Sequence, residues 1–326
     1  MNFVRFASRI LLLACVALVA SPVVTSAGAA QPSEESAKLA GEVQIADVHF
    51  HLERHFSVAD TVALLDRNNV RWAGAVGPIG PQVGSNFRDG FIAALGDRYI
   101  PTLGQPELNV AFLMGGVSAI EDADSPMFRS LLNEGESEFK AGRLKGFGEL
   151  FVNTLRSNPS PKLRRKIRAD APTVRALYLL AGKYGGFLQI HMEMDRDSLE
   201  QLGTLLSIEP KTDVIMSHGG VTADAQLMRE LMTRHSNIYW ELSQKAPPVW
   251  RPGKIHKMIF DESGVAPDWL KLIEDFPDRF MIGTDAYCCD YSQMIATYRK
   301  GLLPRLSPPT LRKVAYENAQ RVMKLK

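Results

Sequence analysis

The sequence predicts one α/β domain with the (β/α)8 TIM-barrel fold, and two observations lead to this prediction. Apolar β-type runs alternate with helix-type patterns along most of the chain, as expected of parallel βαβ units. Eight such runs occur within nearly 300 residues, a length that suits one large barrel. We therefore expect a single barrel domain over residues 43–326.

Each of the eight runs is short enough for a barrel strand. They begin near Val43, Val70, Tyr99, Leu144, Gly186, Asp213, Asn237 and Arg279. Helices are predicted between them, such as one capped by Ser57 and one that starts at Pro172 and ends before Gly185. A last helix over residues 307–325 should close the chain.

The first 30 residues have the pattern of a secretory signal peptide. Basic residues precede the apolar run ILLLACVALVA, and small residues at 27–29 fit a cleavage site. Ser21 and Pro22 break the run, which falls short of the roughly 20 apolar residues that span a bilayer. We expect export to the periplasm without stable membrane association, and lipid attachment at Cys15 is the alternative. Residues 31–42 lack apolar periodicity and are expected to be flexible.

The charge balance bears on the kind of partner. Removal of Arg5 and Arg9 with the leader would leave 36 basic residues against 36 acidic ones. A neutral chain argues against nucleic acid as the main partner. A small-molecule substrate is expected, and a homo-oligomer stays open. Of the three cysteines, Cys288 and Cys289 would remain, and their Cα atoms, about 3.8 Å apart, are too close for an unstrained disulfide.

The stretch IADVHFHLER, residues 45–54, carries a polar row on the first predicted strand. Side chains on a strand alternate between its faces, so His49 and His51 should converge on one point, where they could ligate a metal ion. A hydrogen-bonded histidine pair without metal is the alternative. Asp47 lies one step deeper and either packs in the barrel or accepts a hydrogen bond from a ligand histidine.

Other predicted strands also end in polar residues. The active site of a TIM barrel lies at the carboxyl ends of its strands, so these side chains should meet at one rim. Imidazoles and carboxylates together suit a Zn-type ion. The candidate ligands are His49, His51, Glu149, His191, His218 and Asp285.

These residues lie in motifs that resemble a known family. The ordered set DVHFH, GFGEL, LQIHM, IMSHGG and MIGTDA, followed by AYENAQRVMKL, resembles the amidohydrolase superfamily, and within it the amidohydrolase-related (amidohydrolase 2) group. The resemblance covers the chain from about Val43 to Lys326. It implies that His49 and His51 bind a first metal ion and that His191 and His218 bind a second. It also implies that Asp285 binds the first ion and transfers the catalytic proton.

Glu149 departs from the pattern of many binuclear members, which carry a carboxylated lysine on the fourth strand. A glutamate after glycine is similar to the TatD-like deoxyribonuclease branch, where it is a metal ligand. Strand alternation would put Lys145, Phe147 and Glu149 on one face, with Glu149 nearest the rim. We therefore expect Glu149 to bridge two ions, and a carboxylate paired with an arginine beside a single ion is the alternative.

The resemblance implies a hydrolase that uses a metal-activated water to cleave a small ester, lactone, amide or phosphoester. One or two divalent ions are expected, zinc first, with manganese, iron or nickel as alternatives. The alternative enzyme is a zinc-dependent nonoxidative decarboxylase, usually with one ion. The non-enzymatic alternative is a metal-binding or ligand-binding barrel without catalysis.

Two loops contain residues that could contact a substrate. The loop after the fourth strand carries Arg156, Arg164, Arg165 and Arg168, and the loop after the seventh carries Trp250, Arg251 and His256. Arginines could bind a substrate carboxylate or phosphate, which would make the substrate anionic. The more common role of such a basic run is a solvated surface.

Overall fold

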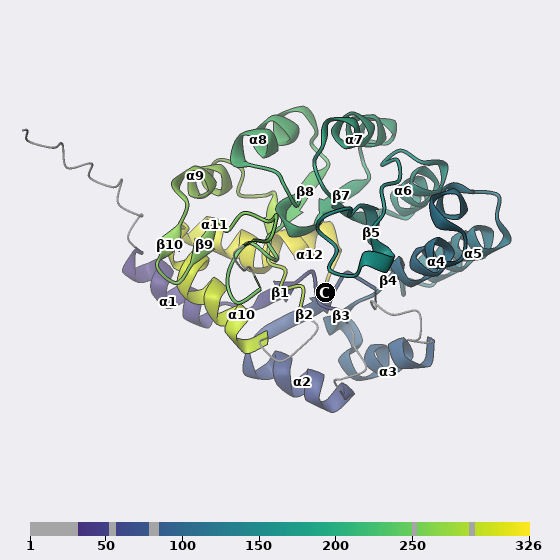
Figure 1. Ribbon diagram of the computed structural model, residues 1–326. Coiled ribbons are helices and arrows are strands. Elements are labelled where there is room, and N and C mark those ends of the chain that lie inside the picture. Colours follow the sequence, from purple (N-terminus) through teal and green to yellow (C-terminus); the bar gives the residue numbers. More distant parts are fainter. Residues whose placement is uncertain (1–31, 52–56, 78–84, 250–252, 287–290) are drawn as a thin grey trace, which may run out of the picture.

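The computed structural model describes residues 32–51, 57–77, 85–249, 253–286 and 291–326. Strands and helices alternate through these ranges, and the helices surround the strands (Figure 1). The barrel strands are β1 (Ile45–Asp47), β2 (Val70–Gly74), β3 (Tyr99–Ile100), β4 (Thr102–Gly104), β5 (Gly146–Asn153), β6 (Phe187–Met192), β7 (Asp213–Met216), β8 (Ile238–Glu241) and β11 (Phe280–Met281). The predicted TIM-barrel fold is confirmed.

The helices follow the strands around the outside of the barrel. They are α1 (Glu34–Glu42), α2 (Val58–Arg67), α3 (Ser85–Leu95), α4 (Gln105–Glu121), α5 (Pro126–Lys140), α6 (Pro172–Tyr184), α7 (Arg196–Ile208), α8 (Ala225–Arg234), α9 (Pro267–Asp275), α10 (Tyr291–Thr297), α11 (Pro308–Arg312) and α12 (Asn318–Val322). A small hairpin of β9 (Phe260–Asp261) and β10 (Gly264–Val265) lies between β8 and α9. Ser57 caps α2, and Gly185 ends α6 in a left-handed conformation, as predicted.

The barrel closes through two connections between its hydrogen-bonded sheets. One sheet has the order β1-β2-β3 and the other β11-β8-β7-β6-β5-β4. The third predicted strand joins them, because Pro101 divides it into β3, which pairs with β2, and β4, which pairs with β5. Proline has no N–H for a strand ladder, which accounts for the break. On the other side, the Val48 N–H donates to Ile282 O at 2.9 Å.

Two buried clusters of apolar side chains stabilise the barrel. The larger one lies between strands and helices, where Phe147 of β5 packs on Phe139 of α5. The smaller one lies inside the barrel, near the amino ends of its strands. It combines strand residues with the C-terminal segment, including Val322 and Leu325. Its strand members are Ala46, Trp72, Ile100, Phe187, Ile215, Tyr239 and Met281. The apolar filling leaves only the opposite end of the barrel for polar chemistry.

The prediction of a flexible segment over residues 31–42 is wrong for most of its length. Residues 34–42 form α1, whose first turn is capped by Ser33, and Ala40 is fully buried. The helix is held by tertiary contacts that its own sequence does not reveal, such as the bond from Ser36 Oγ to Leu306 O at 2.7 Å. The expected signal peptide lies outside the described residues. Among the helices that the structure describes, none is both long and apolar enough to cross a membrane.

Arg299 is the main polar anchor of α1. Its guanidinium donates to Ala40 O at 2.7 Å, to Val43 O at 2.9 Å and to Asn68 O at 3.1 Å. We expect Arg299→Met to lower the free energy of unfolding by about 2 kcal/mol, because three partly buried carbonyls lose a charged donor. The unfolding midpoint in urea measures this change. Arg312→Met, at an exposed position, is the control, and equal midpoints for the two variants would contradict the anchoring role.

Candidate metal centre

The six predicted ligands lie together at the carboxyl end of the barrel. His49 and His51 follow β1, Glu149 lies in β5, and His191 lies in β6. His218 follows β7 in the short helix η3 (Ser217–Gly219), and Asp285 follows β11. All six side chains are buried, the most exposed being Asp285 at 6%. The sequence therefore predicted which residues gather here.

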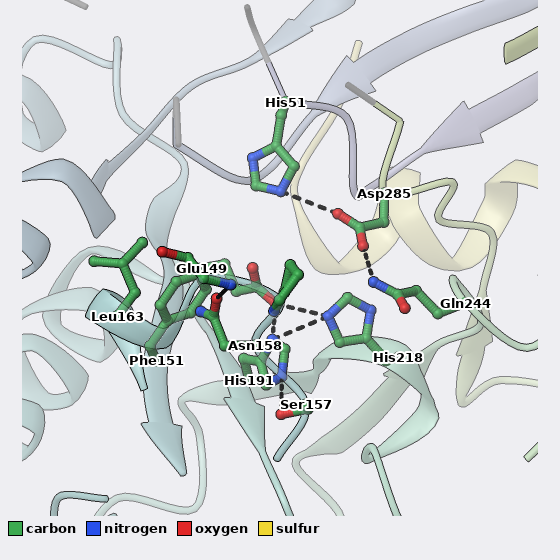
Figure 2. A pocket seen from close by; sticks show the side chains of 12 residues that line it. His51, Glu149, Phe151, Ser157, Asn158, Leu163, His191, His218, Gln244 and Asp285 are labelled. Atoms are coloured by element: carbon green, nitrogen blue, oxygen red, sulfur yellow. Dashed lines mark hydrogen bonds and ion pairs between the residues drawn. The ribbon is translucent and has the colours of Figure 1, made fainter. Parts of the chain in front are cut away.

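One half of the cluster joins the two histidines of β1 to Asp285. The Nε2 atoms of His49 and His51 lie 3.2 Å apart. Asp285 Oδ1 lies 3.4 Å from Nε2 of His49 and 3.3 Å from Nε2 of His51. The other Asp285 oxygen accepts a hydrogen bond from Gln244 (Figure 2).

The other half is built around Glu149, which reaches both pairs of histidines. Its Oε1 lies 3.0 Å from Nδ1 of His191 and 3.1 Å from Nε2 of His218, and those two nitrogens are 3.0 Å apart. Its Oε2 lies 3.6 Å from Nε2 of His49. Glu149 thus stands between the two halves, the position that a bridging ligand would require.

The outer ring nitrogens of three histidines face hydrogen-bond acceptors. His51 Nδ1 lies 2.8 Å from Gly77 O, and His49 Nδ1 lies 2.8 Å from Glu241 Oε1. A carbonyl and a carboxylate can only accept, so both Nδ1 atoms carry a proton and both Nε2 atoms face the centre. The same argument applies to His218, whose Nδ1 lies 2.7 Å from Ser243 Oγ. Because Ser243 Oγ donates its proton to Glu241 Oε1 at 2.9 Å, it accepts from His218 Nδ1.

Glu241 supports the site but was not among the residues predicted from the sequence. It is fully buried at the end of β8 and accepts hydrogen bonds from His49, from Ser243 and from the His218 N–H. The signal was present, since Glu241 is the acidic residue that ends the seventh predicted strand, NIYWELS. It holds two of the candidate ligands at once.

Of the two roles offered for Asp47, packing within the barrel agrees with the structure, because the side chain is fully buried. Its carboxylate accepts from the Thr284 hydroxyl at 2.6 Å, from the Thr284 N–H at 2.9 Å and from the His49 N–H at 3.2 Å. It therefore joins the first strand to the last, while Glu241 orients the His49 ring.

The alternation argument for β5 is also wrong, although it selected the right residue. Phe147 points outward into the helix layer, whereas Glu149 points into the site. The register of β5 against β6 shifts between Phe147 and Leu150, and this irregularity changes which face each side chain takes. Lys145 lies near the other end of the barrel, where its Nζ donates to Lys324 O.

The buried carboxylates of the cluster depend on positive charge close to them. Burial opposes ionisation of Glu149 and Asp285, yet neighbouring His49 holds the pKa of both carboxyls well below the usual range. Burial lowers the pKa of His49, but Glu149, Glu241 and Asp285 raise it well above its usual value. Within the described residues, no lysine or arginine forms an ion pair with these carboxylates.

Three buried carboxylates among inward-facing imidazole nitrogens would repel one another unless a positive charge lies between them. The nearby Lys245 does not fill this role, because its Nζ contacts Val221 O and the Trp269 ring and not these carboxylates, and burial lowers its pKa to about 7. The donor set fits a divalent ion of the zinc or manganese type. Within the ranges that the structure describes, three groups have ligand atoms within 4.8 Å of one another: His49, His51 and Glu149; His49, His218 and Glu241; and Glu149, His191 and His218.

A cavity of about 230 Å³ opens next to this centre. Its apolar lining residues are Phe151, Pro159 and Leu163, and the polar groups Ser157, Asn158 and Ser160 come from the loop after β5. Glu149, His191, His218 and Asp285 of the metal centre line the same cavity (Figure 2). The arrangement places a small molecule against the candidate metal centre.

The four arginines of the loop after β5 do not line this cavity. Arg156 pairs with Glu193, Arg164 donates to Asn158 O, and Arg168 pairs with Asp170. Arg165 is buried and donates to Phe151 O at 2.8 Å. They hold the loop together, so they lend no support to an anionic substrate.

The loop after β8 lies only partly within the described residues. His256 is buried there, with its ring centroid 5.3 Å from that of His218. Trp250, Arg251, Cys288 and Cys289, which the sequence analysis noted, lie outside the described residues.

Comparison with known families agrees with this site. A family model described as Amidohydrolase matches residues 115–325, well over half of the chain. The chain therefore belongs to the amidohydrolase family, whose members are metal-dependent enzymes that act on small molecules. Among curated proteins no match was found.

Several solved structures share the fold at low sequence identity. An uncharacterised TIM-barrel protein from Bordetella bronchiseptica has a TM-score of 0.54 at 15% identity, with 82% of this chain and 83% of that chain covered. A dihydroxybenzoic acid decarboxylase from Polaromonas sp. JS666, with bound manganese, has 0.51 at 11%, covering 81% and 85%. An amidohydrolase from Burkholderia multivorans, with bound zinc, has 0.50 at 14%, covering 83% and 89%.

Glu241→Gln tests whether the carboxylate that binds His49 and the His218 N–H contributes to metal affinity. Both Glu241 oxygens accept hydrogen bonds, so the amide nitrogen of Glu241→Gln must face a donor and disturb His49 or Ser243. We expect divalent metal affinity to fall roughly 10- to 100-fold, as measured by competition with a chelating dye. The exposed substitution Glu200→Gln is the control. An unchanged affinity in Glu241→Gln would show that this carboxylate does not support the ligands.

Proposed function

We propose that this chain is a metal-dependent hydrolase of a small ester, lactone, amide or phosphoester. The observation that carries the proposal is the convergence of four histidines and two carboxylates at one end of the barrel, beside a cavity. Its membership of the amidohydrolase family supports the same conclusion.

The geometry supports a specific assignment of ligands. We assign a first ion to His49, His51 and Asp285, and a second to His191 and His218. Glu149 would contact both ions, since its two oxygens face different histidine pairs. This is the bridging role expected from the sequence.

A divalent ion at this site would supply Lewis acidity, lowering the pKa of water toward neutrality and polarising a carbonyl or phosphoryl oxygen. Asp285 is the group best placed to take up the proton released in hydrolysis. Its Oδ1 faces His49 and His51, while Gln244 fixes the other oxygen. Because Asp285 also borders the cavity, it can pass this proton to a leaving group there.

Zinc is the ion that we propose first. Nitrogen and oxygen ligands also accept manganese, iron and nickel. The zinc-bound and manganese-bound neighbours support a divalent ion of this group.

Nonoxidative decarboxylation is the second candidate function. The manganese-bound neighbour from Polaromonas is a dihydroxybenzoic acid decarboxylase, which shows that this fold also carries that chemistry. A decarboxylase would need a carboxylate substrate and, as expected from the sequence, only one ion. The apolar cavity wall with Phe151 would suit the ring of an aromatic acid.

Metal content and product analysis separate the two candidates. We expect purified protein to hold two divalent ions per chain by elemental analysis and to hydrolyse members of an ester, lactone, amide and phosphoester panel. Removal of metal with a chelator should abolish turnover, and added zinc should restore it. One ion per chain with release of carbon dioxide from aromatic carboxylates would favour the decarboxylase instead.

Asp285→Asn tests the proton-transfer role. The amide keeps the size of the side chain and one oxygen for the metal but cannot accept a proton. We expect kcat to fall about 10²- to 10⁴-fold with metal still bound. Elemental analysis of the same sample excludes simple metal loss. Wild-type turnover in the metal-loaded variant would show that another group transfers the proton.

A further inference from the structure

We propose that Ser157 and Glu193 form a clamp that holds His191 in the orientation needed for metal binding and ties it to the cavity wall. The inference rests on the proposed function, because it concerns a ligand of that site. It assigns a positioning role to two residues that lie outside the ligand set.

The clamp begins at the outer nitrogen of His191. Its Nδ1 lies 3.0 Å from Glu149 Oε1, and its Nε2 lies 2.8 Å from Ser157 Oγ (Figure 2). A serine hydroxyl can donate or accept, so the direction of the second bond depends on what else Ser157 contacts.

Glu193 decides that direction. Its Oε1 lies 3.0 Å from Ser157 Oγ and also accepts from the Ser157 N–H at 2.8 Å and the Arg156 N–H at 2.6 Å. Its Oε2 accepts from Arg156 Nε at 3.0 Å. A carboxylate surrounded by donors takes the hydroxyl proton, which leaves a lone pair of Ser157 Oγ to accept from His191 Nε2–H. The Nδ1 lone pair is then free for the metal.

The same bonds fix part of the cavity wall. Ser157 belongs to the loop after β5 and lines the cavity beside Phe151. The base of this loop is held by backbone bonds from Thr154 N to Arg165 O and from Ile167 N to Val152 O, both 2.8 Å. Glu193 follows β6 and is buried at 3% exposure. The clamp therefore connects the loop after β5 to His191, the candidate metal ligand in β6.

The site contains a second arrangement of the same kind. Ser243 accepts from His218 Nδ1 and donates to Glu241, just as Ser157 accepts from His191 Nε2 and donates to Glu193. In both cases a serine hydroxyl donates to a buried carboxylate and accepts from an imidazole, so the carboxylate fixes the orientation of the ring through the serine. The repetition indicates that serines in the loops after β5 and β8 control the orientation of both histidines.

A nucleophilic role for Ser157 is the competing hypothesis. The distances from Ser157 to His191 and from His191 to Glu149 also match a nucleophilic serine with its base and orienting acid. That mechanism needs the hydroxyl proton to point at His191. The bond from Ser157 to Glu193 directs it elsewhere.

Ser157→Ala tests the clamp in the full-length protein. We expect zinc affinity, measured by competition with a chelating dye, to fall roughly 10- to 100-fold. Most of kcat should return at saturating zinc, because the variant loses orientation and not a ligand. Ser157→Thr keeps the hydroxyl and should retain near wild-type affinity. Glu193→Gln should weaken zinc binding as Ser157→Ala does. Ser160→Ala, in the same loop, should bind zinc as the wild type does.

The outcomes separate this inference from the proposed function. Wild-type protein that binds no divalent ion would overturn the proposed function and the clamp with it. Wild-type protein that binds zinc, with equal zinc affinity in Ser157→Ala, would overturn the clamp alone. If Ser157→Ala kept its zinc affinity but lost turnover, and a fluorophosphonate labelled Ser157 in the wild type, Ser157 would be a nucleophile instead.

Discussion

The burial of three carboxylates in the mouth of the barrel is the constraint on which the site depends. Glu149, Glu241 and Asp285 are almost inaccessible to water, and histidines are their ion-pairing partners within the described residues. Buried negative charge is strongly unfavourable unless it is paired. A protein can keep such a cluster only if protons or a metal ion neutralise it, and the fixed ring tautomers favour a metal ion.

The rest of the site keeps this charge in place. The apolar side chains near the amino ends of the barrel strands exclude water from that end of the site. The outer nitrogens of the histidines form hydrogen bonds with a carbonyl, a carboxylate and hydroxyl groups. These bonds reduce the rotational freedom of each imidazole before a metal ion arrives. Such preorganisation favours both affinity and the choice of one ligand geometry.

Much of the fold and of the site could be predicted from the sequence. His49 and His51 are two residues apart on a strand, and Asp285, His191 and His218 each end another, so local spacing and the barrel rule were enough to bring them together. Glu149 was selected by a flawed argument, since the irregularity in β5 that turns it inward has no signature in the alternation of residues. Glu241 obeyed the rule but was overlooked.

The sequence by itself determined the alternation of strands and helices, the barrel that follows from it, and the residue types at the strand ends. These features are local, because periodicity and chain direction set them. Only the tertiary structure decided that residues 34–42 form a helix against the C-terminal half, that Asp47 joins the first strand to the last, and that Ser157 meets His191. Each of these depends on contacts between segments far apart in the chain or on a loop path, which local patterns do not specify.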